Sequence, residues 1–271
     1  VMLYVLVPPV YFLNIATLEL TASAGAGVAL GWVALSLAGG VAYLVARRLL
    51  HLDRPATGAL VNTALQGNTG YLGLPLCITF LGADRLGEAV VYDSLVQSPM
   101  LLIGVFGVGA AFGTKAGEGV RERARAFVLR NPPLWAVALG LVAPDALAPE
   151  ALVDASRVLV FALLPLGFFA VGVTVAEQAE RGSVAFPPAF TRPVAAALVL
   201  RLVVAPALLL AVAAPLIDLP APYLLLAAMP AGINGLVVAH AYGLDLRLAG
   251  AAIAWSTAVV VAVALVAAAV I

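Results

Sequence analysis

The stretch Gln66–Leu76 places polar and helix-breaking residues inside an apolar run long enough to cross a membrane. Its centre contains Asn68, Thr69, Gly70 and Pro75. Backbone that leaves a helix inside a bilayer is tolerated only where it is buried in protein or lines a wet cavity. Such backbone presents free N–H groups, which favour anions. The stretch is therefore a candidate binding site for a small ligand.

A second stretch of this kind, Met229–Gly235, lies in the last quarter of the chain. It contains Pro230, which has no backbone N–H and leaves a carbonyl without its helical partner, and Asn234. A half-helix that restarts in mid-membrane directs N–H groups and a partial positive charge into the gap. Two such ends would hold a carboxylate, with Asn68, Thr69 and Asn234 adding neutral hydrogen bonds. The alternative is that both stretches are kinks where small residues allow close helix packing.

Four other polar residues lie within apolar segments and are further candidates for this site. Asp93 either carries a coupling proton, or is an interfacial carboxylate or a strut hydrogen-bonded to a broken helix. Gln97, one helical turn further on the same face, is expected to line the same cavity. Arg201 either attracts an anionic substrate or pairs with a carboxylate, and the alternatives are snorkelling to the membrane surface or a structural ion pair. Asn14 either faces the cavity or forms a hydrogen bond between helices.

These residues belong to a chain of 271 residues that is 64% hydrophobic and 10% charged, with a mean hydropathy of +1.11. Soluble domains are about 25% charged, so the composition predicts an all-α polytopic membrane protein. The formal net charge of zero argues against nucleic acid as a partner, and the single cysteine argues against a Cys-rich metal site. We expect no cofactor and no metal.

A spanning helix takes roughly 20 residues, which predicts nine transmembrane segments at 1–20, 25–49, 56–82, 88–113, 128–143, 156–176, 190–216, 221–243 and 247–271.

The positions of lysine and arginine predict the orientation of these segments, because cytoplasmic loops carry the excess of positive charge. Eleven of the 14 basic residues fall in one set of alternate loops, two fall in the opposite set, and Arg201 lies within a segment. The longest connection, 114–127, belongs to the basic set and is predicted to be a cytoplasmic linker. The predicted location is the plasma membrane, which in a bacterium is the inner membrane, with lipid around the helices.

A weak internal repeat divides the chain, because Phe80–Asp84 aligns with Ala241–Asp245 and each follows a segment rich in helix breakers. The repeat pairs the first four segments with the last four and leaves the fifth without a partner. We therefore predict two repeats, 1–113 and 128–271, joined by the linker 114–127. They would form a ten-helix, five-plus-five inverted-repeat fold whose first helix is missing from this chain. Inverted repeats with paired broken helices are typical of secondary transporters.

The stretch Asn68–Pro75 resembles the Asn-x-Gly-aromatic-x-Gly-x-Pro signature of the auxin efflux carrier family of permeases. The residues Met229–Pro230, Asn234 and His240–Asp245 resemble the signature of that family's second repeat. The resemblance implies a fold similar to bile-acid symporters and sodium/proton antiporters, in which two broken helices cross at mid-membrane. It also implies export of a small organic anion such as auxin, malate or malonate.

The function that we predict is secondary transport of such an anion by alternating access, with a proton or sodium as coupling ion. From the family fold we expect a panel near 1–49 and 156–216 to move against a unit of 56–113 and 221–271. A homodimer is a possible assembly. The alternative from another class is a membrane receptor that binds a small ligand without moving it. An enzyme is not expected, because no paired carboxylates or histidine clusters converge and no nucleotide-binding loop occurs.

Overall fold

The computed structural model describes residues 5–18, 21–115, 125, 129, 132–180 and 188–270. The regular secondary structure of these residues is helical, and the described chain contains no β-strand beyond one isolated bridge between two residues. The predicted all-α class is confirmed. The predicted linker 114–127 lies almost entirely outside the described residues.

The helices of the first half are α1 (Val7–Ala16), α2 (Ala22–Leu44), η2 (Val45–Leu49), α3 (Arg54–Leu65), η3 (Thr69–Gly73), α4 (Leu74–Leu81), η4 (Ala83–Arg85), α5 (Leu86–Tyr92), η5 (Asp93–Gln97), α6 (Ser98–Met100), η6 (Leu101–Val105) and α7 (Phe106–Phe112). The second half contains α9 (Pro132–Gly140), η7 (Asp145–Leu147), α10 (Glu150–Glu180), α11 (Arg192–Val199), η8 (Leu200–Val204), α12 (Ala205–Ala213), α13 (Ala221–Ala227), α14 (Ile233–Tyr242) and α15 (Leu246–Val270).

Polar caps set where several of these helices begin. Asp53 caps α3, because its carboxylate accepts a hydrogen bond from the N–H of Ala56 at 2.9 Å. Thr21 caps α2 in the same way through the N–H of Ala24, at 3.1 Å. The carboxylate of Asp245 caps the first turn of α15. Each cap supplies an acceptor to N–H groups that a helix leaves unpaired at its start.

Four continuous helical stretches are long and apolar enough to cross a membrane: Ala22–Leu49, Ala83–Phe112, Arg192–Ala213 and Leu246–Val270. Val7–Ala16 and Thr69–Leu81 are shorter apolar helices. The predicted class of polytopic membrane protein is confirmed by these stretches. Two of the predicted segments, 56–82 and 221–243, are each divided into two shorter helices.

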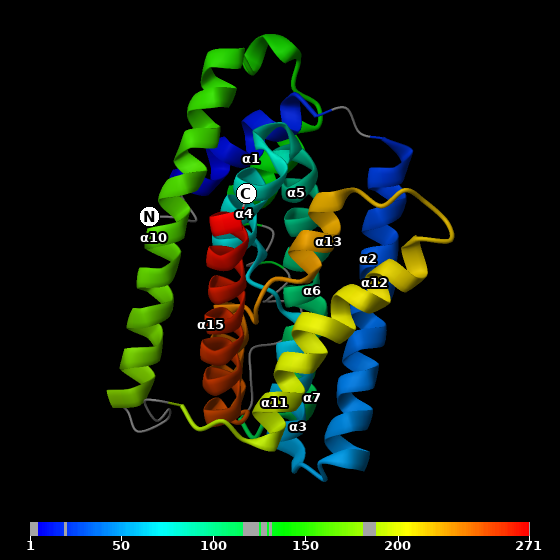
Figure 1. Ribbon diagram of the computed structural model, residues 1–271, viewed down its shortest axis with the longest axis vertical. Helices are drawn as coiled ribbons and strands as arrows, with labels where there is room; N and C mark the ends of the chain where they lie inside the picture. The colour runs from blue at the N-terminus through cyan, green and yellow to red at the C-terminus, as the bar shows by residue number, and fades with distance from the viewer. Residues whose placement is uncertain are drawn as a thin grey trace.

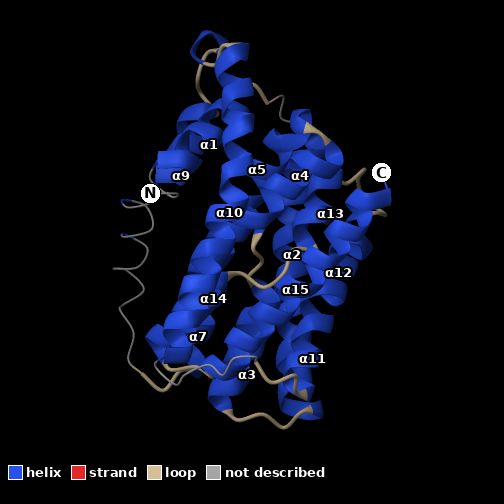
Figure 2. Ribbon diagram, turned by 60° about the vertical axis from the view of Figure 1, so that its left-hand side comes forward, coloured by secondary structure: helices blue, strands red, loops and turns tan. Residues whose placement is uncertain are grey.

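The two divided segments run in opposite directions through the middle of the molecule. α3 lies near one end of the long axis and α4 near the other, whereas α13 lies at the same end as α4 (Figure 1). The chain passes from α3 towards α4 in one direction and from α13 towards α14 in the other, as Figure 2 shows from a second side. Both interruptions therefore fall between the ends, at about the same depth.

The contacts between helices do not follow the panel that we expected, in which 1–49 and 156–216 form one group. α1 packs against α9 and α10, and this group stands along one side of the molecule (Figure 2). α2 instead packs against α3 and α12. Its small residues allow the close approach, since a Cβ at Gly31 would lie 3.1 Å from Val96 and one at Gly39 would lie 2.9 Å from Leu65. α2 and α12 therefore belong with the divided helices.

Candidate functional site

The two divided helices meet where each is interrupted. Residues 66–68, the first interruption, separate α3 from η3, and residues 228–232, the second interruption, separate α13 from α14. Gly67 and Ala231 form an antiparallel bridge between them. Neither interruption is a loose loop, because each uses the other as its hydrogen-bonding partner.

Two backbone hydrogen bonds flank this bridge. The N–H of Asn68 donates to the carbonyl of Pro230 at 2.8 Å, and the N–H of Gly232 donates to the carbonyl of Gln66 at 2.9 Å. The backbones approach so closely that a Cβ at Gly232 would lie 2.8 Å from the carbonyl oxygen of Gly67. Glycine is therefore required at this contact. The bonds satisfy backbone groups that would otherwise be costly inside a membrane.

Side chains from other helices supply donors to the remaining carbonyls at the end of α3. The carbonyl of Leu65 accepts a hydrogen bond from Nε2 of Gln97 at 2.9 Å. The carbonyl of Ala64 accepts one from Nη1 of Arg201 at 3.1 Å. In a continuous helix the N–H of Asn68 would bond to Ala64, but that N–H is used in the bridge. Gln97 and Arg201 therefore replace helical donors that the interruption removes.

Arg201 binds the end of α13 as well. Its Nε donates to the carbonyl of Met229 at 2.8 Å and its Nη2 to the carbonyl of Ala227 at 3.0 Å. The residue is 0% exposed and makes no salt bridge with any described residue. The N–H of Ala231 finds a separate acceptor in Oγ of Ser256, at 3.1 Å. The predicted ion pair with a carboxylate is not found among the described residues, and a fully buried side chain does not snorkel to the membrane surface; Arg201 instead binds backbone carbonyls at two helix ends, a contact that the sequence did not predict.

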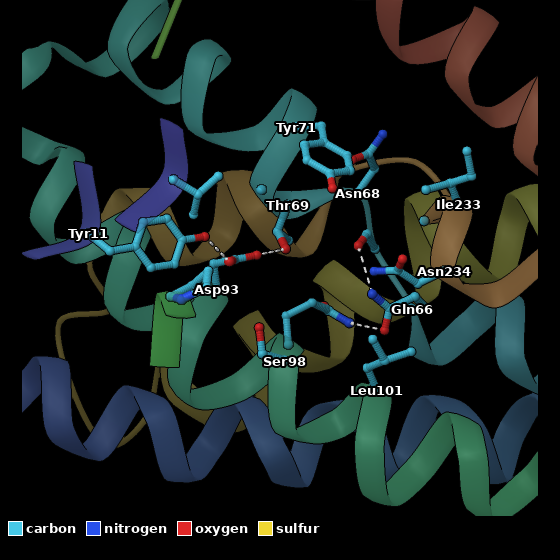
Figure 3. Close-up of a pocket in the computed structure, with 16 residues that line it drawn as sticks. Tyr11, Gln66, Asn68, Thr69, Tyr71, Asp93, Ser98, Leu101, Ile233 and Asn234 are labelled. Carbon is cyan, nitrogen blue, oxygen red and sulfur yellow. Dashed lines mark hydrogen bonds between the residues drawn. The ribbon is translucent and has the colours of Figure 1, made fainter. Parts of the chain in front are cut away.

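We call the point where the two interruptions meet the crossing. A cavity of about 300 Å³ lies beside it (Figure 3). α1, both interruptions, η3, the stretch from η5 to η6, α9 and the start of α14 contribute to its wall. The structure brings together around it six of the residues predicted from the sequence: Asn68, Thr69, Gly70, Asp93, Gln97 and Asn234. The volume is at the lower end of the range of small-molecule sites.

The cavity faces the N-terminal ends of two helices. Thr69 and Gly70 begin the helical stretch of η3 and α4, and Ile233 and Asn234 begin α14. The first N–H groups of a helix have no acceptor within that helix and carry partial positive charge. The freed carbonyls accept the hydrogen bonds described above, whereas the residues that begin the two helices line the cavity. Helix N-terminal ends of this kind favour a negatively charged group.

Asp93 lies in the wall of the same cavity, between Tyr11 and Thr69 (Figure 3). The hydroxyls of Tyr11 and Thr69 each donate a hydrogen bond to its carboxylate. Among the described residues that line the cavity, Asp93 is the only one with an ionisable carboxyl or basic side chain. No group of three His, Cys, Asp or Glu side chains in the described chain is placed to hold a metal ion.

Short π-helical segments position Thr69 and Asp93, which line the cavity, and Arg201, which binds the ends of α3 and α13. Thr69 begins η3, Asp93 begins η5, and Arg201 is the second residue of η8. A π-turn shifts the residues after it around the helix axis and often marks a functional site. Here it allows Asp93, Arg201 and Thr69 to approach the crossing from helices that otherwise present apolar side chains.

Other predicted site residues lie outside the wall of the cavity. Pro75 is buried at the second residue of α4, within the continuous helical stretch Thr69–Leu81, where its missing N–H leaves a carbonyl of η3 without a helical donor. Pro230 contributes its carbonyl to the bridge. The amide of Asn14 donates to Oγ of Ser156 in α10 at 3.0 Å and accepts from Nε of Arg157 at 3.5 Å. Asn14 therefore makes the interhelical contact that was one of its two predicted roles.

Tyr11, Gln66, Tyr71 and Ser98 also line the cavity; Gln66 and Tyr71 belong to the predicted stretch Gln66–Leu76 but were not predicted as individual site residues, and Tyr11 and Ser98 lie outside it. Gln66 and Tyr71 lie within or beside the first signature, so position in that motif was a usable signal. Tyr11 lies one helical turn before Asn14 in the first apolar segment, and a hydroxyl at that depth was the available hint. Ser98 directly follows Gln97 and has no separate signal in the sequence.

Comparisons with known proteins identify a family and two relatives. Residues 125–268, more than half of the chain, match the model of a family described as membrane transport protein. An uncharacterized transporter of Methanothermobacter thermautotrophicus is 35% identical over 107 residues, which are 40% of this chain and 33% of the relative. An uncharacterized transporter of Methanocaldococcus jannaschii is 28% identical over 102 residues, which are 38% of this chain and 32% of the relative. The chain thus spans about a third of the length of the curated relatives it matches.

Proposed function

This chain belongs to the membrane transport protein family, of the auxin efflux carrier type that its two motifs resemble, and from that membership we propose that it moves a small organic anion across the plasma membrane by alternating access. Its class is that of a multi-pass membrane transporter. The anion would carry at least one carboxylate, as auxin-like acids, malate and malonate do. A permease of this kind binds and releases its substrate without changing it.

The observation that carries this proposal is the division of polar groups at the crossing. Donors from Arg201, Gln97 and the bridge bind the freed carbonyls. The first residues of η3 and α14, whose N–H groups have no acceptor within their helices, line the cavity. A carboxylate between these two ends would receive hydrogen bonds from backbone N–H groups and from the amides of Asn68 and Asn234.

Asp93 is the coupling group in this proposal, and the coupling ion is a proton. An ionised Asp93 accepts hydrogen bonds only, and its charge repels an anion in the same cavity of about 300 Å³. A proton on Asp93 removes that repulsion and adds a donor. Proton and anion would therefore occupy the cavity together, and the empty carrier would return without them. Sodium is disfavoured as the coupling ion, because the described wall of the cavity offers one carboxylate rather than a pair.

The finer fold that we propose is the five-plus-five inverted repeat, with α3–α4 and α13–α14 as its crossing helices. Three features support it: the opposite directions of the two divided helices, the antiparallel bridge between their interruptions, and the sequence repeat. The predicted orientation has support from the gathering of basic residues at one end of the long axis, where η2 ends and α3, α11 and α15 begin (Figure 1). That end would be cytoplasmic.

The moving parts that we propose follow the packing rather than the expected panel. α1, α9 and α10 form one group, and the divided helices with α2, α11, α12 and α15 form the other. The cavity lies between the two groups, since Tyr11 and Pro133 line it from α1 and α9. The hydrogen bond from Tyr11 to Asp93 also joins them. A shift of one group against the other would thus open the cavity and break this bond together.

Counterflow in proteoliposomes tests the proposal. Vesicles containing the purified protein are loaded with unlabelled malate, malonate or indole-3-acetate, and entry of the labelled acid is measured against protein-free vesicles. Saturable entry that is accelerated by the loaded acid is the expected result. Stabilisation of the protein by an acid without any counterflow would assign it to receptors instead. Entry that rises linearly with concentration, without acceleration, would indicate a channel.

A further inference from the structure

Arg201 binds the C-terminal ends of both crossing helices, α3 and α13. Ala64 belongs to the last turn of α3, and Ala227 and Met229 lie at and just after the end of α13. One guanidinium binds all three carbonyls, at 3.1, 3.0 and 2.8 Å. The planar fork of arginine supports this pattern, because it presents donors in several fixed directions. The ammonium of lysine presents its donors from a single atom.

The guanidinium also lies directly against the bridge between the interruptions. A Cβ at Gly67 would lie 2.3 Å from Nη2 and 2.9 Å from Cζ of Arg201. Gly67 itself is part of the wall of the cavity. The charge of Arg201 therefore lies one residue behind that wall, and only glycine at position 67 leaves room for it.

Helix ends take the place of a counter-ion for this buried charge. No described carboxylate forms a salt bridge with Arg201. The C-terminal end of a helix carries a partial charge of about −0.5, so the ends of α3 and α13 together offset roughly one positive charge. Loss of the guanidinium would leave two like-charged helix ends facing each other in the membrane.

We propose that Arg201 is the positioning residue of the crossing. It holds the C-terminal ends of α3 and α13 together, and this fixes the N-terminal ends of η3 and α14 towards the cavity. Arg201 is not among the described residues that line the cavity. The effect of Arg201 on transport rests on the function proposed above. Its stabilisation of the contact between the two helix ends does not depend on that function.

The contact between Gly67 and Arg201 provides the test. Three variants, Gly67→Ala, Arg201→Lys and the double variant, are compared for thermal unfolding of the purified protein without added acid. Gly67→Ala should lower the Tm on the order of 10 °C, because the new methyl displaces the guanidinium. Arg201→Lys should lower it less, and the double variant should be no less stable than Arg201→Lys alone, because lysine has no Nη2 for the methyl to meet.

Gly235→Ala is the matched control, because it lies in the first turn of α14 and a Cβ there meets nothing within 4 Å. It should leave the Tm unchanged and should add independently to Arg201→Lys. Additive losses for Gly67→Ala and Arg201→Lys, or a neutral Gly67→Ala, would overturn the proposed hold on the crossing. These unfolding measurements require no substrate, so they test the role of Arg201 even if the protein transports none of the acids.

Counterflow kinetics separate positioning from a general structural role. With malonate as probe, Arg201→Lys should raise KM about tenfold while the maximal rate per folded protein is retained, because the anion-binding helix ends are displaced. A lower maximal rate at unchanged KM would show that Arg201 only maintains the fold. Absence of counterflow in the unmodified protein would contradict the proposed function. The unfolding measurements alone would then test whether Arg201 holds the two helix ends together.

Discussion

The N–H of Asn68 donates a hydrogen bond to the carbonyl of Pro230, 162 residues further along the chain, at 2.8 Å. This bond uses the donor that would have continued α3, and proline at position 230 cannot continue α13. Each interruption therefore depends on the other. The side chain of Asn68 has no part in this bond, so the binding role of its amide can be tested separately from the crossing.

Asn68→Ala should weaken anion binding without loosening the crossing. The backbone N–H that binds Pro230 is retained, whereas the amide that faces the cavity is lost. A neutral hydrogen bond contributes about 0.5–1.5 kcal/mol, so KM for malonate in counterflow should rise by up to about tenfold with an unchanged Tm. Asn62→Ala, which removes a buried amide of α3 outside the cavity, should leave KM as it is. Equal effects from both variants would contradict a binding role for Asn68.

Asp93→Asn should remove the dependence of uptake on pH. Asparagine has nearly the shape of aspartate and cannot take up a proton; its carbonyl accepts from one of the hydroxyls of Tyr11 and Thr69, and its NH2 donates to the oxygen of the other. Uptake of malonate by the unmodified protein should weaken as the pH rises from about 5 to 8, through a rising KM. In the variant KM should be nearly constant over this range when it is expressed as the concentration of the malonate dianion, because malonate itself loses its second proton in this window. KM at the alkaline end should fall about tenfold below that of the unmodified protein, because the repelling charge is gone.

The matched control for this change is Asp154→Asn, which alters an exposed carboxylate paired with Arg157 outside the cavity. Its pH profile should follow the unmodified protein. A pH profile of Asp93→Asn that also follows the unmodified protein would exclude Asp93 as the proton carrier.

The sequence predicts the components of the site better than their arrangement. Helix breakers in apolar runs are local features, so Asn68, Pro230 and Asn234 stand out without any knowledge of packing. Asn14 had two predicted roles, because a polar group at membrane depth binds either a ligand or a neighbour, and Arg201 was expected to bind an anion or a carboxylate or to reach the membrane surface rather than to bind helix-end carbonyls. Only the positions of other helices decide between them, and these place Ala64 and Ala227 around Arg201 and Ser156 beside Asn14. Tyr11 was missed for the same reason, since its partner Asp93 lies 82 residues away.

Ser256→Ala should destabilise the second interruption. Oγ of Ser256 is the acceptor for the N–H of Ala231, and the residue is 0% exposed. A buried N–H without a partner costs about 1–3 kcal/mol, which a lower Tm of the purified protein should report. The neighbouring Thr257→Val is the control, because the hydroxyl of Thr257 is buried without a partner among the described residues. That change should be neutral or stabilising, and a loss of similar size in both variants would contradict the role of Ser256.

A cysteine in place of Ser98 should report directly on occupation of the cavity. Ser98 lines the cavity and is half-buried, whereas the single native cysteine, Cys77, is buried elsewhere. An anionic methanethiosulfonate reagent should therefore modify Ser98→Cys and leave the unmodified protein unlabelled. Saturating malonate should slow this labelling at least about tenfold, because at 100 times Kd about 99% of sites are filled. Ser156→Cys, buried between α1 and α10 outside the cavity, is the control and should not react with or without acid. Labelling of Ser98→Cys at the same rate with and without an acid that raises the Tm would place that acid at a different site.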